Sequence, residues 1–256
     1  MMDTNLKGKT AAITGGARGI GFAVARSLAA EGADIALLDL LDTVEEAAQR
    51  IEDEFGVHAF GQRLDVTDQD ATNTAFEAIA ERLSVPQVLL TAAGIEINGD
   101  SIDVTAAQWR KVIDVNLTGT FFSAQAFGRG LLASDLPGSA VLISSMSGEI
   151  VNVPQWAASY NSSKAAVAHL STSLAVEWAS SDIRVNSIAP GYVLTDLTQQ
   201  IIDREPELEA DWISRIPQGR MATPQDLTGL VVFLASNASS YLTGQQIIID
   251  GGYTSI

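Results

Sequence analysis

Short apolar segments and longer amphipathic segments alternate along the whole chain. The apolar segments are near-continuous runs, which is typical of strands buried on both faces of a sheet. Seven segments are predicted to be strands: 10–14, 35–39, 58–64, 86–91, 140–143, 184–188 and 246–250. Six segments are predicted to be helices: 22–30, 43–55, 68–83, 106–132, 160–179 and 224–234. This alternation predicts the α/β class, with a parallel sheet covered by helices on both faces.

One domain over residues 1–256 is predicted, because no Pro-, Ser- or Gly-rich linker divides the chain and no long-period repeat occurs. Segment 198–213 interrupts the alternation, since it is charged and contains Pro206. We therefore predict irregular structure there, within an insertion at about 195–215 that covers the site as a lid. At the second helix, Thr43 and Glu46 have the spacing of a capping box.

The composition excludes several classes of function. The net charge of −16 argues against binding to nucleic acid or to an anionic membrane surface. The absence of Cys excludes disulfides and thiolate chemistry. The sequence shows no apolar run of membrane-spanning length and no apolar region typical of a secretory signal, which predicts a cytoplasmic protein. Neither His nor the acidic residues have the spacing of metal ligands, so no metal site is predicted.

Glycines interrupt the chain between the first predicted strand and the first predicted helix. Gly15, Gly19 and Gly21, with Arg18 and Ile20 between them, form this turn. Glycine permits a tight turn and lets backbone N–H groups approach a pyrophosphate closely. The spacing is G-x-x-x-G-x-G rather than G-x-G-x-x-G. Glycines also end strands without any ligand, but their position in the first βα unit favours a dinucleotide site.

Two residues bear in opposite directions on which dinucleotide binds. Asp39 ends the second predicted strand, where an acid accepts hydrogen bonds from the adenosine ribose and repels a 2′-phosphate. Arg18 could instead pair with a 2′-phosphate. Because Leu40 and Leu41 supply no cation beside Asp39, the sequence favours NAD over NADP.

Tyr160 and Lys164 are spaced one helical turn apart, so on a helix they are neighbours on one face. A cation held about 4 Å from a phenolate, at an effective dielectric near 20, stabilises it by about 4 kcal/mol. Before the opposing effect of burial, this lowers a tyrosine pKa from about 10 towards 7. Such a pair can act as a general acid–base on a hydroxyl, although the same spacing alone is usually an ordinary helix face.

Further short motifs follow in a fixed order, and together they resemble the short-chain dehydrogenase/reductase family over essentially the whole length. The motifs are Thr14-Gly-Gly-Ala-Arg-Gly-Ile-Gly21, Asp65-Val66, Val115-Asn116-Leu117, Ser145, Tyr160-x-x-x-Lys164, Pro190-Gly191 with Thr195, and Asp250-Gly251-Gly252. The resemblance implies a single-domain Rossmann fold with a seven-stranded parallel sheet, a nicotinamide cofactor and hydride transfer at a carbinol or carbonyl carbon. It also implies a homotetramer with an interface through segments 106–132 and 160–179.

The resemblance also implies roles for individual residues. Tyr160 would be the acid–base, and Ser145 would orient the substrate oxygen. Lys164 would bind the nicotinamide ribose and lower the pKa of Tyr160, and Asn116 would hold a water that links Lys164 to solvent. From the residues alone, Asn116 is a helix-interior Asn satisfied by backbone. The other cofactor contacts implied are Asp65 and Val66 beside the adenine, Ala93 and Gly94 after the fourth strand, and Pro190, Val193 and Thr195 beside the nicotinamide.

The chain departs from the family pattern in two places. Thr91-Ala-Ala-Gly94 stands where the family usually has Asn-Asn-Ala-Gly, which leaves Thr91 to satisfy any buried backbone groups there. The loop between Ser145 and Tyr160 is also slightly enlarged.

The enlarged loop, with segments 153–155, 160–161 and 175–178, is similar to the polyol/ketose branch of the family: galactitol, sorbitol, mannitol and arabinitol dehydrogenases and sorbose reductases. Ser147 and Asn152 lie on this loop. Both could bind substrate hydroxyls, or both could merely tie the loop together.

The sequence therefore predicts an NAD-dependent oxidoreductase that interconverts a secondary alcohol and a ketone, acting on a small molecule such as a sugar alcohol. One alternative is an NADP-dependent β-ketoacyl or general carbonyl reductase, and the net charge and Asp39 argue against it. Another is a steroid or aromatic-alcohol dehydrogenase, which would need an apolar loop where Ser147 and Asn152 stand. A third, from another class, is a non-catalytic NAD-sensing or scaffold protein, which could dispense with the Tyr160 and Lys164 side chains.

Overall fold

A single parallel sheet of seven strands runs through the computed structural model, which describes residues 3–256. The strand order is β3-β2-β1-β4-β5-β6-β7. The strands are β1 (Thr10–Thr14), β2 (Asp34–Asp39), β3 (Ala59–Arg63), β4 (Val88–Thr91), β5 (Gly138–Ile143), β6 (Ile183–Pro190) and β7 (Gln246–Ile249). The order reverses between β1 and β4. In open parallel sheets, ligands bind in the crevice that such a reversal creates at the carboxyl ends of the strands.

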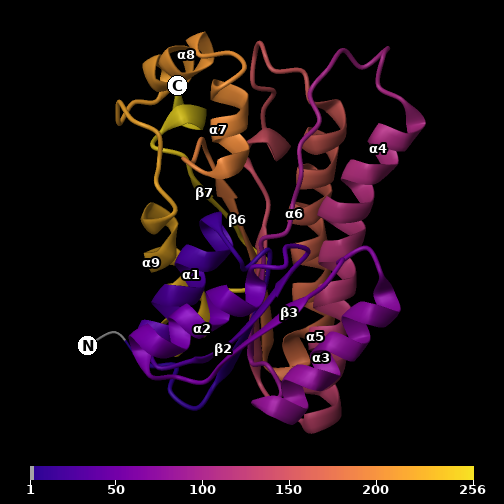
Figure 1. Cartoon of the computed structure of the whole chain (residues 1–256), viewed down its shortest axis with the longest axis vertical. Helices are drawn as coiled ribbons and strands as arrows, with labels where there is room; N and C mark the ends of the chain where they lie inside the picture. Colours follow the sequence, from indigo (N-terminus) through magenta and orange to yellow (C-terminus); the bar gives the residue numbers. More distant parts are fainter. Residues whose placement is uncertain (1–2) are drawn as a thin grey trace.

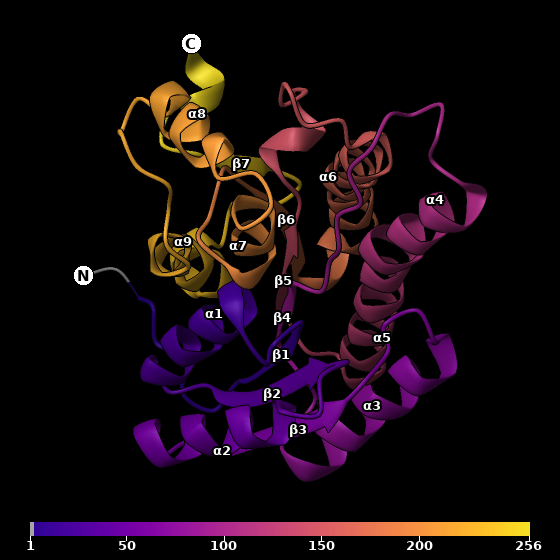
Figure 2. The same ribbon diagram turned by 45° about the horizontal axis from the view of Figure 1, so that its top comes forward.

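Helices cover both faces of this sheet (Figures 1 and 2). Residues of α1, α2 and α9 pack in the core of one face, and residues of α3, α5 and α6 pack in the core of the other. The helices are α1 (Gly19–Ala30), α2 (Val44–Phe55), α3 (Gln69–Arg82), α4 (Ala106–Ile113), α5 (Gly119–Ser134), α6 (Ala158–Trp178), α7 (Asp196–Ile202), α8 (Glu207–Arg215) and α9 (Gln225–Ala235).

Successive strand residues point to opposite faces, and both faces are apolar. In β1, Ile13 belongs to the core under α1 and Ala12 to the core under α3 and α5. In β2, Leu37 and Leu38 divide in the same way, and all four residues are fully buried. The near-continuous apolar runs of the sequence are therefore explained by burial on both sides, and each of the seven predicted strands is confirmed.

The predicted helix over 106–132 is present but is not uniform. It divides into α4 and α5, with a π-helical turn over Asp114–Thr118 between them. Such turns occur mostly as single-turn insertions in α-helices and frequently at functional sites. The periodicity of apolar residues does not reveal one inserted residue, so the sequence did not predict this π-helical turn.

Two local predictions were wrong. Segment 198–213 is not irregular but helical: Thr195 caps α7 through a capping box with Thr198, and Pro206 is the N-cap residue of α8. Proline is tolerated at a helix start because the first N–H groups have no intrahelical acceptor. The proposed capping box of α2 does not form, since the Thr43 side chain makes no capping hydrogen bond.

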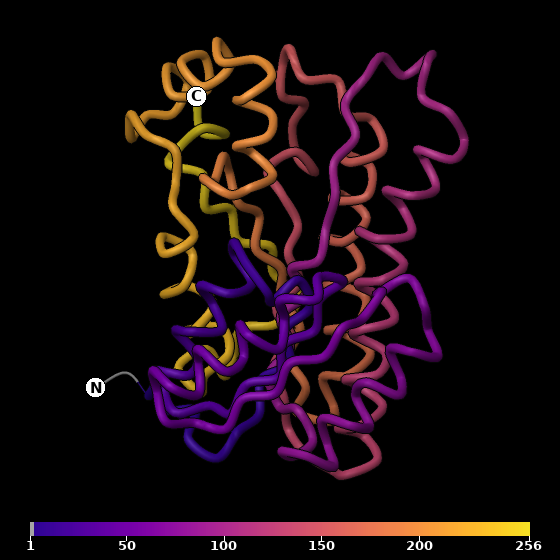
Figure 3. The backbone as a smooth tube through the Cα atoms, viewed as in Figure 1, coloured from indigo at the N-terminus to yellow at the C-terminus, as the bar shows by residue number. Residues whose placement is uncertain are grey.

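Helices α7 and α8 lie beyond the carboxyl ends of β6 and β7, next to the C-terminus (Figures 1 and 3). They form a third apolar cluster with the loop after β5, in which Trp212 of α8 is fully buried and Met146 nearly so. The enlarged loop and the segment 195–215 are therefore packed against each other at the edge where the predicted site residues gather. Within residues 3–256, no helix has both the length and the apolar character needed to cross a bilayer.

Candidate active site

The β1–α1 turn is built for a close backbone approach. Gly15 has φ +67°, and a Cβ on it would lie 2.6 Å from the Ala92 carbonyl carbon and from Ala93 N. A Cβ on Gly21 would lie 2.1 Å from the Gly15 oxygen. Glycine is therefore required at both positions. Helix α1 follows at once, with no acidic residue in its first turn, so its free N–H groups and its dipole favour an anion such as a pyrophosphate.

A cavity of about 870 Å³ opens in front of this turn. It reaches from β2 to the start of α7, and it gathers most of the residues that the sequence predicted to bind a cofactor. These are Gly15, Arg18, Gly19, Ile20, Gly21, Asp39, Asp65, Val66, Ala93, Gly94 and Thr195. Four other predicted cofactor contacts are not in its lining: Pro190 ends β6, Val193 is buried and pairs with Ala222, and Tyr160 and Lys164 lie on α6.

Asp39 and Arg18 are placed differently in this cavity. The Asp39 carboxylate accepts hydrogen bonds from the backbone N–H groups of Ala17 and Leu41, both at 3.0 Å, which fixes it at the end of β2. The Arg18 guanidinium donates instead to Asp196 of α7 at 2.7 Å. This ion pair connects the glycine turn to the helix over the site, and it directs Arg18 to a carboxylate.

The three residues of the predicted catalytic group converge from two elements. Ser145 follows β5, and Tyr160 and Lys164 lie in the first two turns of α6. The Ser145 hydroxyl lies near enough to Tyr160 to lower the pKa of the phenol. The Lys164 Nζ lies 5.6 Å from the centroid of the Tyr160 ring and donates to the Ile143 carbonyl at 2.9 Å. Tyr160 and Lys164 are therefore neighbours on α6, as their spacing predicts.

The electrostatics of this group are dominated by burial. Burial raises the pKa of Tyr160 above its usual value, the negative charge of Glu96 raises it further, and the nearby Ser145 hydroxyl acts in the opposite direction. Burial also lowers the pKa of Lys164 to about 8, while Glu96 opposes that change. In the chain alone, the effect of burial on Tyr160 is thus larger than the lowering expected from Lys164.

Asn116 lies in the π-helical turn and is fully buried. Its Oδ1 accepts from Ile95 N at 2.8 Å, and its Nδ2 donates to Ile95 O at 2.9 Å and to Ser163 Oγ at 3.1 Å. Asn116 is therefore satisfied by backbone, but by the loop after β4 rather than by its own helix. We call the two hydrogen bonds between Asn116 and the backbone of Ile95 the Asn116 clamp. In the same loop, Gly94 lies so close to α6 that a Cβ on it would be 3.6 Å from Lys164 Nζ.

Thr91 does not do what the sequence suggested. Its buried hydroxyl has no hydrogen-bond partner within residues 3–256, so it does not replace the asparagines that the family usually has there. The segment is held by Asn116 instead, through Ile95.

The enlarged loop is tied together by its own polar side chains. Asn152 Nδ2 donates to Ser147 Oγ at 2.7 Å, and Ser147 N donates to Ser145 Oγ at 3.1 Å. Ser147 and Asn152 are both buried, and Asn152 Oδ1 has no partner within the described chain. Ser147 and Asn152 therefore tie the loop together, which is one of the two roles that the sequence left open. The Oδ1 of Asn152 is the one acceptor that remains for a ligand.

Two residues near the site, Glu96 and Tyr192, were not predicted from the sequence. Glu96 follows the clamped Ile95 and lines the cavity. Tyr192 donates its hydroxyl to Gln155 Oε1 at 2.7 Å and stacks on Trp212 at 4.2 Å between ring centroids. The only signal in the sequence was position, since Glu96 stands two residues after Gly94 and Tyr192 directly follows Gly191.

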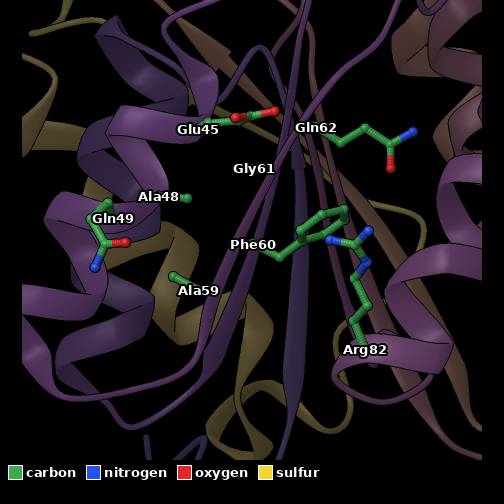
Figure 4. A pocket seen from close by; sticks show the side chains of 8 residues that line it. All are labelled: Glu45, Ala48, Gln49, Ala59, Phe60, Gly61, Gln62 and Arg82. Atoms are coloured by element: carbon green, nitrogen blue, oxygen red, sulfur yellow. The ribbon is translucent and has the colours of Figure 1, made fainter.

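A smaller hollow of about 360 Å³ lies between α2 and the edge strand β3 (Figure 4). Arg82 covers the Phe60 ring there, 4.4 Å from its centroid. The hollow holds none of the predicted site residues. Within residues 3–256, no three His, Asp or Glu side chains are grouped so that they could hold a metal ion.

Comparison with known proteins bears directly on this site. A family profile described as enoyl-(acyl carrier protein) reductase matches residues 15–254. The sorbose reductase of Candida albicans is 41% identical over 252 residues, which cover 98% of this chain and 88% of the relative. The galactitol 2-dehydrogenase (L-tagatose-forming) of Cereibacter sphaeroides is 43% identical, covering 97% of this chain and 96% of the relative.

The chain belongs to the short-chain dehydrogenase/reductase family. Its curated relatives place it in the polyol branch. A family member of known structure from Mycobacterium marinum superposes with a TM-score of 0.94 at 39% identity, covering 99% of this chain and 98% of that one. A gluconate 5-dehydrogenase of Burkholderia cenocepacia, solved with NADP and tartrate, has a TM-score of 0.94 at 32% identity, covering 100% and 98%. Family membership makes the protein an oxidoreductase that uses a nicotinamide cofactor.

The clamp on Ile95 predicts a specific loss. Asn116→Ala leaves two backbone groups of Ile95 without partners, and we expect the free energy of unfolding to fall by about 2–4 kcal/mol. The amide of Ile95 should also exchange its hydrogen faster. Denaturant unfolding and hydrogen exchange measure both. Asn73→Ala, which removes only an exposed contact with Arg129, serves as the control and should cost less than about 0.5 kcal/mol. Equal effects of the two variants would contradict the clamp.

Proposed function

We propose that this protein uses NAD to interconvert a secondary alcohol and a ketone on a sugar alcohol or ketose. The observation that carries the proposal is that Tyr160 and Lys164 lie together on α6, with Lys164 Nζ only 3.6 Å from where a Cβ on Gly94 of the cavity would lie. The sugar-alcohol substrate is supported by relatives named for sorbose and galactitol.

In the oxidative direction, Tyr160 as the phenolate accepts the proton of the substrate hydroxyl. In reduction, its phenol returns the proton to the carbonyl oxygen. Ser145, whose hydroxyl lies near Tyr160, directs the substrate oxygen towards it. The bound nicotinamide supplies the hydride acceptor or donor. Lys164 stabilises the phenolate from its position near the ring, against the burial that favours the phenol.

The fit to a dinucleotide rests on the cradle of the β1–α1 turn, which a Cβ on Gly15 would fill. The preference for NAD rests on Asp39. Its carboxylate is held by Ala17 and Leu41 at the end of β2, where it can accept hydrogen bonds from ribose hydroxyls and repels a 2′-phosphate. Arg18, the one residue that argued for NADP, is engaged with Asp196.

Asn152 is the proposed contact for a further substrate hydroxyl. Its Oδ1 is buried without a partner, while its Nδ2 is already used by Ser147. A buried acceptor that lacks a hydrogen bond gains one when a ligand hydroxyl donates to it. A polyol offers such donors at every carbon, whereas a steroid or a simple secondary alcohol does not.

The rest of the fold suggests a lid and an assembly. We propose that α7 and α8 close over the bound substrate, because they pack against the loop of Ser147 through Met146 and are tied to the cofactor turn by the Arg18–Asp196 pair. A homotetramer is consistent with three large apolar side chains exposed on α4, α5 and α6, namely Trp109, Leu132 and Val176.

The proposal is tested by initial rates with NAD and NADP on sugar alcohols, simple secondary alcohols and a β-hydroxyacyl thioester. We expect kcat/KM with NAD to be about 100-fold higher for the best sugar alcohol than for a simple secondary alcohol, since two or three extra hydrogen bonds each contribute about 1 kcal/mol. Preference for the thioester with NADP would identify a β-ketoacyl reductase instead. NAD binding without turnover of any alcohol would identify a sensing or scaffold protein.

The role of Asp39 is tested by Asp39→Ser. Removing a carboxylate about 5 Å from a 2′-phosphate, at an effective dielectric near 20, relieves about 3 kcal/mol, so the NAD/NADP ratio of kcat/KM should fall about 100-fold. Asp42→Ser is the matched control, because Asp42 is an exposed acid in the same loop that pairs with Arg63. An unchanged ratio in Asp39→Ser, or a wild-type preference for NADP, would reverse the assignment.

A further inference from the structure

Glu96 is an acid at the active site that the catalytic scheme above does not use. It lines the cofactor cavity, and its backbone is fixed because both backbone groups of the preceding Ile95 are held by Asn116. It is half-buried. The side chain therefore has a defined place in the site, immediately beyond the glycine that borders Lys164.

The loop that carries Glu96 runs past Lys164, since a Cβ on Gly94 would lie 3.6 Å from Lys164 Nζ. The charge of Glu96 acts on Tyr160 and Lys164 of α6 and on Tyr192 after β6. Asn98, in the same loop, acts to lower the pKa of the Glu96 carboxyl. Yet no ion pair within residues 3–256 includes Glu96, so no Lys, Arg or His nitrogen of the described chain lies within 4.0 Å of its carboxylate oxygens.

An acid placed in this way has no structural duty that needs a charge. A partly buried carboxylate without a salt bridge is costly unless something donates hydrogen bonds to it. The hydroxyls of a polyol are such donors, and hydrogen bonds to an ionised acceptor are about twice as strong as neutral ones. A substrate that carries its own carboxylate would meet a like charge in the same space.

We propose that Glu96 selects the substrate: its carboxylate accepts hydrogen bonds from hydroxyls of an uncharged polyol or ketose and repels sugar acids. This deepens the proposed function and rests on it. The same fold also occurs in a gluconate 5-dehydrogenase, an enzyme named for a sugar acid, so the fold alone does not set this selectivity. Glu96 thus acts in specificity, and Tyr160 keeps the proton chemistry.

The selectivity should depend on pH. Burial raises the pKa of Glu96 to about 7, with Asn98 and the charge of Lys164 opposing that change. Repulsion of sugar acids is therefore present above pH 7 and is lost as the pH falls through it. Tyr160, Lys164 and Tyr192 also face Glu96, and Arg110 and Lys111 line the same cavity. Their titration should change kcat/KM for both substrates of a matched pair, sugar alcohol and sugar acid. Its effect should therefore largely cancel in the ratio of the two kcat/KM values.

The test compares wild type with Glu96→Gln on two matched pairs, sorbitol with gluconate and galactitol with galactonate. In Glu96→Gln we expect kcat/KM to fall about tenfold for the sugar alcohol, because a charged acceptor becomes a neutral one. We expect it to rise about 100-fold for the sugar acid, since a like charge about 5 Å away is removed. Both changes should appear mainly in KM. For the wild type, the ratio of kcat/KM for the sugar alcohol to kcat/KM for the sugar acid should increase from pH 6 to pH 9. For Glu96→Gln, the same ratio should not increase.

Asp100→Asn is the control, since it removes an exposed acid from the same loop outside the cavity. Its ratio should equal that of wild type. If Glu96→Gln lowers kcat/KM equally for both substrates of a pair, Glu96 only holds its loop. The specificity role is then wrong, while the proposed function stands. If wild type oxidises no sugar alcohol, the proposed function and the Glu96 assignment both fail.

Discussion

The hydrogen bonds between the Asn116 side chain and the backbone of Ile95 hold this active site together. They join a turn of the helix between α4 and α5 to the loop that leaves β4, and a third bond joins the same amide to Ser163 of α6. The π-helical turn is where Asn116 lies. Through this one buried amide, the cofactor loop, the acid–base helix and the carboxylate of Glu96 acquire fixed relative positions.

With these positions fixed, the charges of the site act against burial in a small volume. The low polarity around Tyr160 favours its neutral phenol, and the same burial favours a neutral Lys164. Glu96 favours a charged Lys164 but opposes a charged Tyr160. In the proposed mechanism, the balance of nearby charges rather than solvent therefore sets the proton affinity of Tyr160. Substrate and cofactor add to that balance when they bind, which makes their own charges part of the selection.

Much of the fold could be predicted because its determinants are local or periodic. The strands are apolar on both faces and the glycine turn is strict, so the order of elements and the cofactor end followed from the residues. The π-helical turn could not be predicted, since one inserted residue leaves the helical periodicity nearly unchanged. Helices α7 and α8 were missed because Pro206 and the charged residues around it suggested a break, whereas the proline only begins α8.

The residues of the site could be predicted to different extents for the same reason. Tyr160 and Lys164 are neighbours on one helix, so their spacing sufficed. Glu96 and Tyr192 are brought to them by the tertiary fold, and neither lies in a pattern that marks it. The partner of Arg18 was equally out of reach, since Asp196 is 178 positions away along the chain. Spacing along one element is visible in a sequence, whereas distance across the sheet edge is set only by packing.

The central claim is that Tyr160 transfers the substrate proton, and single-turnover kinetics of Tyr160→Phe test it most directly. The account predicts that the variant folds and binds NADH with wild-type affinity, while the rate of hydride transfer from a sugar alcohol falls about 10²- to 10⁴-fold. A folded Tyr160→Phe variant that transfers hydride at a near-normal rate would contradict the account.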